Sequence, residues 1–281
     1  MSITYINGEF IPKESVHISP DDRGFMLADG IYEVVRWYQG FFFDMESHML
    51  RMKRSLHELR INWDNNESFP SISLELIKRN NLENSPAMVY IQVTRGAAKR
   101  THNFPVKEVS PTVYAYAWGF KPDITSQEQG IKVMLKEDIR WSRCDIKSIA
   151  LLANTLSFQE AYENGFKECV FVRNGHITEG AHSNVFFVID ETLYTHPESN
   201  YILQGVTRKN VIRIARETGI NIREEALNEN RLRDVREAFI TNTSAEVTPV
   251  INVGGITIGN GVPGPVTGMI LEKFKNNIRP L

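Results

Sequence analysis

The sequence has little of three features that would each define a class of protein. It contains two cysteines, Cys144 and Cys169, in 281 residues, so it lacks the disulfide framework of a small secreted domain, and a reducing compartment suits it best. No apolar run approaches the ~18 residues that a membrane-spanning helix needs. The first residues show neither the basic nor the apolar region of a secretory signal. We therefore expect a cytoplasmic protein with no membrane partner.

An excess of charge of either sign is also absent. The chain carries 32 Lys and Arg residues against 34 Asp and Glu residues, a formal net charge of −2. Proteins that bind nucleic acid through their overall field are usually strongly basic, so we expect no nucleic-acid partner. Hydrophobic residues make up 42% of the chain and charged residues 23%, as in an ordinary folded globular protein.

The first part of the chain has the pattern of a small α+β domain. Asn7-Gly8 lies between two short apolar segments, which is a strong signal for a β-hairpin. Apolar residues recur at helical spacing from Met45 to Leu59. Residues 88–95 and 112–118 alternate between apolar and polar positions, as half-buried strands do.

The second part mixes strands and helices. Strands are predicted at 131–135, 169–172 and 185–189, and helices at about 150–164, 206–218 and 264–276. Gly165 and Gly219 are placed to end two of these helices. We expect a two-domain α+β / α/β protein, with a smaller α+β domain over residues 1–118, a linker over 119–126 and a larger α/β domain over 127–281.

Lys147 is the first candidate for chemistry. It follows the basic and aromatic stretch 140–145 and precedes a predicted apolar helix. If such a lysine lies in a partly dry site, desolvation lowers its pKa and makes available the neutral amine that a Schiff base with an aldehyde requires. Considered alone, a solvated surface lysine is the commoner case.

Glu179 is the second candidate. It stands beside Gly180 and before an apolar strand, where a carboxylate could bind the ring nitrogen of a cofactor, although a solvated turn residue is the simpler explanation. His176, Glu179 and His182 could instead bind a metal if the segment were helical. Gly175 and Gly180 argue against a helix there, so we expect no metal site.

Two further groups could bind anions. Gly205-Val206-Thr207 opens a predicted helix, and backbone N–H groups at a helix start bind phosphate. Thr243 lies in a hydroxyl-rich turn, and Arg51 could add a bidentate guanidinium. In a loop after a strand, Arg100 and His102 could converge on one carboxylate. A cap, a turn or a solvated charge explains each of these when it is considered singly.

Taken together and in this order, these segments resemble the fold-type-IV enzymes that use pyridoxal 5′-phosphate (PLP). The resemblance is carried by Asp145-Ile-Lys147-Ser, Thr178-Glu179-Gly180 with Ser183-Asn184, Gly205-Val-Thr207-Arg208 and Thr243 to Pro249, and it runs from Asn7-Gly8 to about Gly268. The family includes D-amino-acid, branched-chain and amine transaminases and aminodeoxychorismate lyase. Asp29-Gly30-Ile-Tyr32-Glu-Val-Val and Arg100-x-His102 look most like the D-amino-acid aminotransferases of this family.

The resemblance implies a role for each candidate. Lys147 would be the Schiff-base lysine and proton shuttle, and Glu179 would pair with the pyridine nitrogen while Arg140 keeps it ionised. The other implied contacts are Arg51, Val206, Thr207 and Thr243 at the phosphate, Leu203 at the ring, and Tyr32, Arg100 and His102 around the substrate carboxylate. Ala181, His182 and Asn242 stand near the cofactor where the family has serine-type residues.

The implied activity is PLP-dependent transfer of the amino group of D-amino acids, of the D-alanine and D-glutamate class, to 2-oxo acids by a ping-pong mechanism. The implied partners are small amino and keto acids and a second copy of the chain, because family members are homodimers in which Arg100 and His102 can come from the partner. The alternatives are a branched-chain L-amino-acid aminotransferase and then an aminodeoxychorismate lyase, and the Arg100-x-His102 pair counts against both. A non-catalytic PLP-binding carrier is the non-enzyme alternative, which Lys147 and the carboxylate trap argue against.

Overall fold

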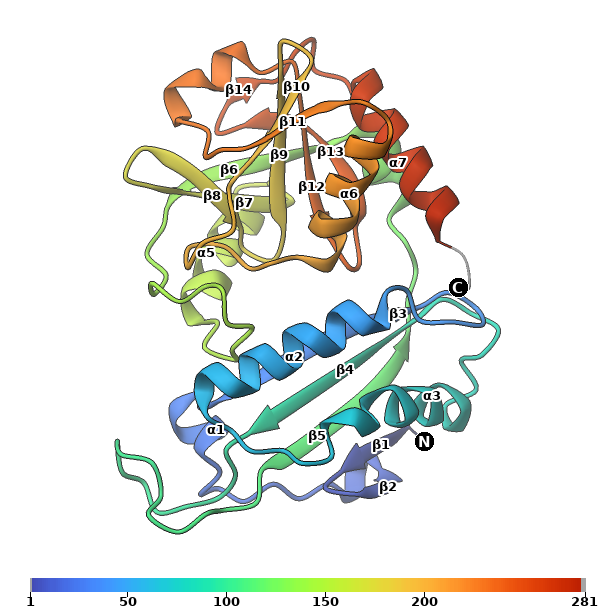
Figure 1. Ribbon diagram of the computed structural model, residues 1–281, viewed down its shortest axis with the longest axis vertical. Coiled ribbons are helices and arrows are strands. Elements are labelled where there is room, and N and C mark those ends of the chain that lie inside the picture. The colour runs from blue at the N-terminus through green and yellow to red at the C-terminus, as the bar shows by residue number, and fades with distance from the viewer. Residues whose placement is uncertain (1, 279–281) are drawn as a thin grey trace. The chain divides into compact units, whose positions relative to one another are not determined.

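The computed structural model describes residues 2–278, and they form two compact units (Figure 1). The first unit contains the chain up to Lys121 together with Ile146–Ala150, and the second contains Pro122–Asp145 and Leu151–Ile278. The predicted linker, 119–126, therefore includes the last residue of one strand and the start of a short helix. The segment that holds Lys147, expected in the larger domain, is part of the first unit. Residue 1 and residues 279–281 of the predicted domains lie outside the described residues.

The first unit is an antiparallel sheet with helices on one face. Its strands are β1 (Ile3–Ile6), β2 (Glu9–Pro12), β3 (Gly30–Trp37), β4 (Ala87–Thr94) and β5 (Thr112–Gly119), in the order β2-β1-β5-β4-β3. Its helices are η1 (Lys13–Ser15), α1 (Arg23–Leu27), α2 (Met45–Leu59), η2 (Asn66–Ser68) and α3 (Phe69–Arg79). The predicted hairpin is confirmed, and Asn7 and Gly8 make its turn with φ of 48° and 105°.

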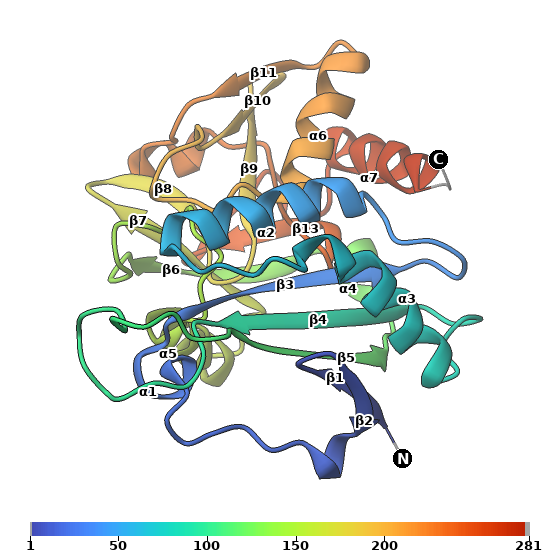
Figure 2. The same cartoon turned by 60° about the horizontal axis from the view of Figure 1, so that its bottom comes forward.

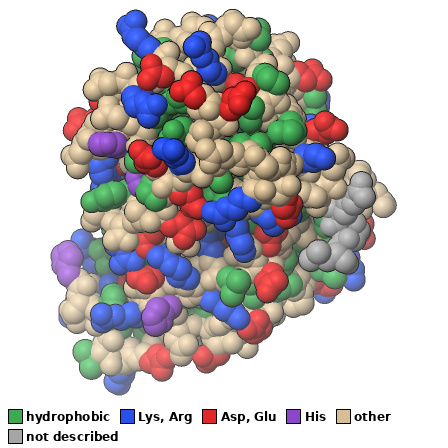
Figure 3. All heavy atoms as spheres, turned by 45° about the horizontal axis from the view of Figure 1, so that its top comes forward, with side chains coloured by type: hydrophobic (Ala, Val, Ile, Leu, Met, Phe, Trp, Pro, Cys, Tyr) green, Lys and Arg blue, Asp and Glu red, His purple; other side chains and the backbone are tan. Residues whose placement is uncertain are grey.

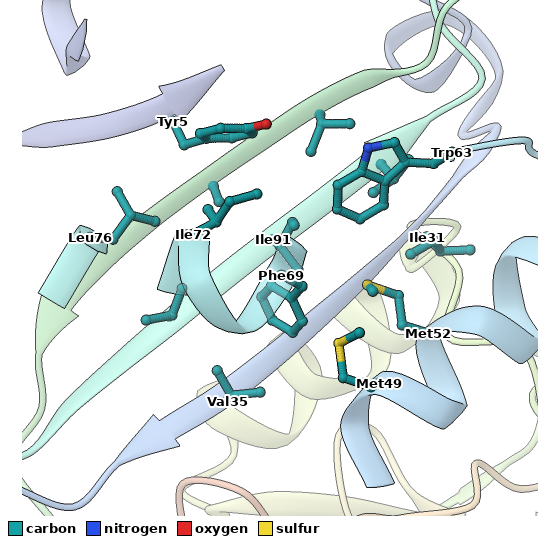
Figure 4. Close-up of a cluster of buried hydrophobic side chains, with 14 of the residues drawn as sticks. Tyr5, Ile31, Val35, Met49, Met52, Trp63, Phe69, Ile72, Leu76 and Ile91 are labelled. Atoms are coloured by element: carbon teal, nitrogen blue, oxygen red, sulfur yellow. The ribbon is translucent and has the colours of Figure 1, made fainter. Parts of the chain in front are cut away.

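Alternate strand positions of this sheet form the core of the first unit. Val89, Ile91 and Val93 are buried, as the alternation predicts, and they pack with side chains of α2 and α3 such as Met52 and Phe69 (Figure 4). Each such fully buried aliphatic side chain contributes roughly 1.5–3 kcal/mol to stability. The opposite face of β3, β4 and β5 carries half-buried aromatic residues.

Helix α2 carries Arg51, one of the residues that the sequence suggests for anion binding. The helix begins after Asp44, whose carboxylate accepts a hydrogen bond from the backbone N–H of Ser47, and this caps its first turn. It ends at Arg60, which adopts a left-handed conformation with φ of 54°. Helix α2 lies along β3 (Figure 2), and Met49, Met52 and Leu56 of its predicted apolar stripe are buried in the core of the unit.

The second unit is built on a larger mixed sheet. Its strands are β6 (Ile131–Glu137), β7 (Glu168–Arg173), β8 (His176–Gly180), β9 (Asn184–Ile189), β10 (Thr192–Thr195), β11 (Asn221–Glu224), β12 (Glu237–Asn242), β13 (Glu246–Val253) and β14 (Ile256–Thr257). Their order is β11-β10-β9-β12-β13-β6-β7-β8, with β14 paired to β13. Its helices are α4 (Ile124–Gln129), α5 (Leu152–Glu163), α6 (Val206–Glu217), η3 (Glu229–Asp234) and α7 (Pro265–Asn277).

The three helices predicted for this part of the chain are present as α5, α6 and α7. Gly165 and Gly219 follow α5 and α6 with φ of 77° and 76°, so they supply the left-handed residue expected after a helix. Strands β9 and β10 are buried at every position, which explains why they show no alternation in the sequence. The sheets and helices of the two units confirm the predicted fold class.

Two surface properties bear on partners. Side chains of both charges are interspersed on the face shown in Figure 3, in keeping with the net charge of −2. Between residues 2 and 278, no helix combines the length and the hydropathy that crossing a membrane demands.

Candidate active site

The segment that contains Lys147 lies against strand β3. Its carbonyl accepts a hydrogen bond from the N–H of Tyr32 at 3.0 Å, and Ile149 donates to the carbonyl of Gly30 at 3.1 Å. The N–H of Lys147 donates to Oγ of Ser55 on α2 at 3.2 Å. Three backbone contacts therefore fix a segment that has no regular secondary structure of its own.

The amine of Lys147 is left available by this arrangement. The side chain is half-buried, and Nζ lies 4.1 Å from the centroid of the Tyr32 ring. No carboxylate among residues 2–278 forms an ion pair with Nζ. An amine beside an aromatic ring and without a salt bridge is suited to covalent chemistry with an aldehyde.

A buried ionic group stands next to this lysine segment in the first unit. Glu33 on β3 accepts hydrogen bonds from Nε and Nη2 of Arg51 at 2.7 and 2.8 Å and is 2.9 Å from Nδ1 of His48. Burial raises the pKa of Glu33, but the charge of Arg51 and the hydrogen bonds outweigh it and hold that pKa well below its usual range. Burial lowers the pKa of His48, and its Nδ1 faces the Glu33 carboxylate at hydrogen-bond distance.

Sequence reasoning found Arg51 but missed its partners. Arg51 and His48 lie three residues apart on α2, and Glu33 interrupts an apolar strand. A charged residue in such a strand is a signal that could have indicated a buried ion pair, because a lone buried carboxylate is very costly.

The carboxylate of Glu179, at the end of β8, is surrounded by donors in the second unit. It accepts hydrogen bonds from Nη1 of Arg140 at 2.6 Å, from Nδ2 of Asn184 at 3.0 Å and from the N–H of Leu203 at 2.9 Å. Burial raises the pKa of Glu179 to about 7, against the opposing effect of Arg140. Arg140 thus lies beside Glu179 and favours its ionised form, as the resemblance implies, but in the protein alone burial has the larger effect.

Arg140 is itself fixed by a second carboxylate. Its Nε and Nη2 donate to Asp138 at 2.9 and 3.0 Å, and Nη2 also lies 3.2 Å from the carbonyl of Tyr201. Arg173 donates to the same aspartate at 3.2 Å. Sequence reasoning missed Asp138 and Arg173, because the contact with Arg173 joins residues 35 positions apart.

The start of α6 presents backbone donors without a side-chain cap. Its N-cap residue is Gly205, and no side chain accepts a hydrogen bond from the first turn. A Cβ on Gly205 would lie 2.1 Å from Oδ1 of Asn184, so only glycine fits beside the residue that holds Glu179. Val206 and Thr207 follow and are buried. Free N–H groups at a helix start attract an anion.

Asn242, the last residue of β12, adds a side-chain donor. Its Oδ1 accepts hydrogen bonds from the N–H groups of Ser244 and Ala245 at 3.0 and 2.6 Å, which shapes the turn that contains Thr243. Its Nδ2 is buried and has no hydrogen-bond partner among the described residues. A buried donor without a partner needs an explanation such as a bound ligand, and a phosphate group has the acceptor oxygens that an amide N–H and an uncapped helix start bind.

His182 has a carboxylate partner. Its Nδ1 lies 2.9 Å from Glu168, which is fully buried and also accepts a hydrogen bond from Oγ of Ser183 at 2.8 Å. His176, the other histidine weighed for a metal, lies against the carbonyl of Asn174. In the part of the chain that the structure describes, no three His, Cys, Asp or Glu side chains are arranged to hold a metal ion.

The three residues expected around a substrate carboxylate lie in the first unit but are not joined there. Tyr32 is half-buried and stacks on Tyr90 with ring centroids 5.7 Å apart. Arg100 and His102 are exposed in the loop of residues 95–111. No hydrogen bond or ion pair of the described chain links either of them to Tyr32.

Comparison with known proteins gives a consistent answer. Residues 30–253, which include every site residue described above, match the family model described as Amino-transferase class IV. A D-alanine aminotransferase of Staphylococcus haemolyticus is 40% identical over 279 residues, or 99% of this chain and 98% of the relative. The branched-chain amino acid aminotransferase of Escherichia coli is a similar solved structure, with a TM-score of 0.90, 28% identity and coverage of 98% of this chain and 94% of that chain. The branched-chain amino acid aminotransferase of Thermobaculum terrenum in its PLP form has the same fold, with a TM-score of 0.85, 22% identity and coverage of 98% and 93%.

Proposed function

Because the chain belongs to the class IV aminotransferases, we propose that it transfers the amino group of D-amino acids, of the D-alanine and D-glutamate class, to 2-oxo acids with PLP. The observation that carries this is the 40% identity to a D-alanine aminotransferase over 99% of the chain. The similar solved structures are branched-chain enzymes at 28% identity or less among those compared. The Escherichia coli enzyme makes a branched-chain L-amino-acid aminotransferase the second candidate.

Lys147 is the residue that carries the cofactor and moves the proton. Bound PLP supplies an electron sink for the bonds at the substrate Cα. Nζ of Lys147 would hold the cofactor covalently. The same Nζ would take the proton from the substrate Cα as general base and return one as general acid. The absence of an ion pair at Nζ supports this role.

Glu179 holds a proton at the pyridine nitrogen. Its carboxylate is oriented by Arg140, Asn184 and the N–H of Leu203, while burial raises its pKa to about 7. A carboxylate in this state gains from a cation at hydrogen-bond distance, and a protonated ring nitrogen is such a cation. Leu203 would support the ring of the bound cofactor, and His182 would lie near it.

The phosphate group of the cofactor would be held by backbone and side-chain donors. They are the N–H groups of Val206 and Thr207 at the start of α6, the amide of Asn242 with Thr243 beside it, and the guanidinium of Arg51. The buried Nδ2 of Asn242 and the uncapped helix start support this assignment.

Tyr32, Arg100 and His102 bind the substrate carboxylate, and the last two act from the partner in a homodimer. Their loop and the neighbouring helix α1 expose apolar side chains: Phe25 is 80% exposed and Val106 97% exposed. Apolar exposure of this degree beside charged residues favours an interface with a second copy. A cytoplasmic location is supported by the two free cysteines, both buried.

One experiment tests the activity. The purified holoenzyme is mixed with D-alanine and 2-oxoglutarate, and separately with L-leucine and 2-oxoglutarate, and the keto acids and the visible absorption of the cofactor are followed. Pyruvate and D-glutamate are expected from the first mixture, and no turnover is expected from Lys147→Ala. Reaction of L-leucine alone would establish the branched-chain alternative, whereas pyruvate released without an amino acceptor would indicate a lyase.

A further inference from the structure

Two arginines of the first unit meet at one aspartate. Oδ2 of Asp29 accepts hydrogen bonds from Nε of Arg23 and from Nε of Arg95, both at 2.8 Å, and Oδ1 accepts from Nη2 of Arg95 at 2.9 Å. The side chains are only 3%, 9% and 11% exposed for Arg23, Arg95 and Asp29. Three charged groups shielded from water in this way hold one another in a single geometry.

Arg23 and Arg95 also contact the loop of residues 95–111, each at a different residue. Nη1 of Arg23 donates to the carbonyl of Thr101 at 2.8 Å, and Thr101 is the residue between Arg100 and His102. The guanidinium of Arg95 lies 3.7 Å from the centroid of the Phe104 ring. The segment from Arg100 to Phe104 is therefore held at both ends by groups that share Asp29.

The far side of Arg95 is anchored in helix α2. Its Nη2 and Nη1 donate to the carbonyls of Leu59 and Arg60 at 2.6 and 2.8 Å. These carbonyls end the helix and need donors. Because Asp29 directly precedes β3, the loop is tied to the sheet and to a long helix.

The rest of the loop has few other supports. Its base is fixed, since Ala98 donates to Asp21 and Arg23 donates to Gly96 through backbone N–H groups. Six residues between Phe104 and Pro111, together with Arg95 and residues 60–62 that follow α2, line a cavity of about 200 Å³. Beyond Ala98, the described residues give the loop two long-range hydrogen bonds, one to Thr101 and one between Asn62 and Glu108.

We propose that Asp29, Arg23 and Arg95 are positioning residues for substrate binding, which hold the backbone between Arg100 and His102 so that both side chains meet a carboxylate together. This inference rests on the proposed function, in which Arg100 and His102 bind that carboxylate. Preorganisation of this kind raises affinity because the loop need not be ordered by the ligand.

Arg23→Met is the variant of choice. It removes the hydrogen bond to Thr101 and leaves Asp29 paired with Arg95, so the buried charges stay balanced. Asp29→Asn would leave two arginines facing each other and is avoided. The control is Asn80→Ala, which removes two hydrogen bonds to the backbone of Ile3 in the same unit and does not touch the loop.

Two measurements on the holoenzyme are combined. Trypsin cleavage after the exposed Lys99 and Arg100, followed by mass spectrometry, reports loop order without any catalysis. Steady-state kinetics report KM for D-alanine and 2-oxoglutarate. For Arg23→Met we expect cleavage faster by about fivefold or more, and KM higher by about tenfold with kcat changed by less than about threefold. Asn80→Ala should match the wild type in both.

Arg100→Leu separates the two ideas. If it raises KM but Arg23→Met changes neither cleavage nor KM relative to Asn80→Ala, the positioning role is overturned and the carboxylate trap stands. Faster cleavage of Arg23→Met with an unchanged KM also overturns the positioning role, because the loop is then less ordered without any effect on substrate binding. If Arg100→Leu leaves KM unchanged, the trap itself is wrong, and the positioning role for substrate falls with it.

Discussion

Glu33 receives both the Nε and the Nη2 hydrogen bonds of Arg51, at 2.7 and 2.8 Å, in the interior of the first unit. The side chains are 0% and 9% exposed, so the pair is a buried, two-point ion pair. It sets the direction of the guanidinium proposed to bind the phosphate, and His48 supports the same carboxylate. The carboxylate therefore acts on the cofactor site through Arg51.

Glu33→Gln should cost both stability and cofactor affinity. The variant leaves Arg51 buried without its counter-ion, and breaking such a pair typically destabilises a protein by about 3–5 kcal/mol. Urea unfolding of the apoprotein and equilibrium dialysis of PLP measure the two effects. Glu75→Gln is the control, because Glu75 forms an exposed pair with Arg79, and its loss should change stability by less than about 1 kcal/mol. Equal unfolding curves for the two variants would contradict the prediction.

Glu179 should make the apoprotein less stable as the pH rises. Burial raises its pKa from 4.5 to about 7. Between these two pH values the folded state therefore keeps a proton that the unfolded state has lost. The contribution of this proton to the free energy of unfolding is fully present below about pH 4.5. It is lost as the pH rises through about 7. We expect the free energy of unfolding to fall by roughly 2–3 kcal/mol across this window relative to Glu179→Gln.

The comparison is made by urea unfolding at several pH values with and without PLP. The difference between the wild type and Glu179→Gln isolates this carboxyl from other titrating groups. A protonated pyridine nitrogen favours the ionised carboxylate, so the fall should be smaller in the holoenzyme. Parallel curves for the two apoproteins would show that Glu179 is already ionised throughout.

Gly205→Ala should weaken cofactor binding through Asn184. The new Cβ would lie 2.1 Å from Oδ1 of Asn184, which must move and release Glu179 and the carbonyl of Leu203. We expect the Kd for PLP to rise by about tenfold or more, which is ~1.4 kcal/mol. Gly268→Ala is the matched control, because it lies in α7 with open space at the Cβ position and should be neutral or stabilising. An unchanged Kd would show that Asn184 can move freely.

Asn242→Asp should discriminate between a structural and a ligand-binding amide. The aspartate keeps the oxygen that shapes the turn but replaces the unpartnered Nδ2 by a second oxygen that repels phosphate. The Kd for PLP should rise by about tenfold or more, and urea unfolding of the apoprotein measures separately the cost of burying the new carboxylate oxygen. Asn242→Ser, which retains a donor, should bind PLP normally. Normal binding by the aspartate variant would remove Asn242 from the phosphate site.

Elements with a clear period could be predicted from the sequence. Helix α2 matches its predicted span, and the hairpin at Asn7-Gly8 and the helix-ending glycines are confirmed. Helix α3 was missed although Phe69, Ile72, Leu76 and Ile77 carry helical spacing. Strands β8, β10 and β11 were missed because the first two are buried almost throughout and the third is mostly exposed, so none alternates as a half-buried strand does.

The sequence indicates the candidate site as a list of residues but not as a set of contacts. The motifs single out Lys147 and Glu179 as candidates, since they come with distinctive neighbours in the sequence. Asp138 stands in no motif, and Asp29 and Glu33 stand in the segment Asp29-Gly30-Ile-Tyr32-Glu-Val-Val without a role of their own. Each of the three becomes informative only when the fold brings an arginine to it. Burial, which raises the pKa of Glu179, is likewise a property of the folded chain alone.

The described chain changes unit at Lys121–Pro122, Asp145–Ile146 and Ala150–Leu151. During translation, the growing polypeptide can begin to collapse around α2 and α3 early, since N-terminal domains generally fold first. Ser148, which bridges to Ile31, emerges from the ribosome only after more than half of the 281 residues have been joined. The lysine proposed to hold the cofactor is therefore made with the last segment of the first unit that the structure describes, so a nascent chain would acquire its chemistry only after much of its N-terminal part has been made.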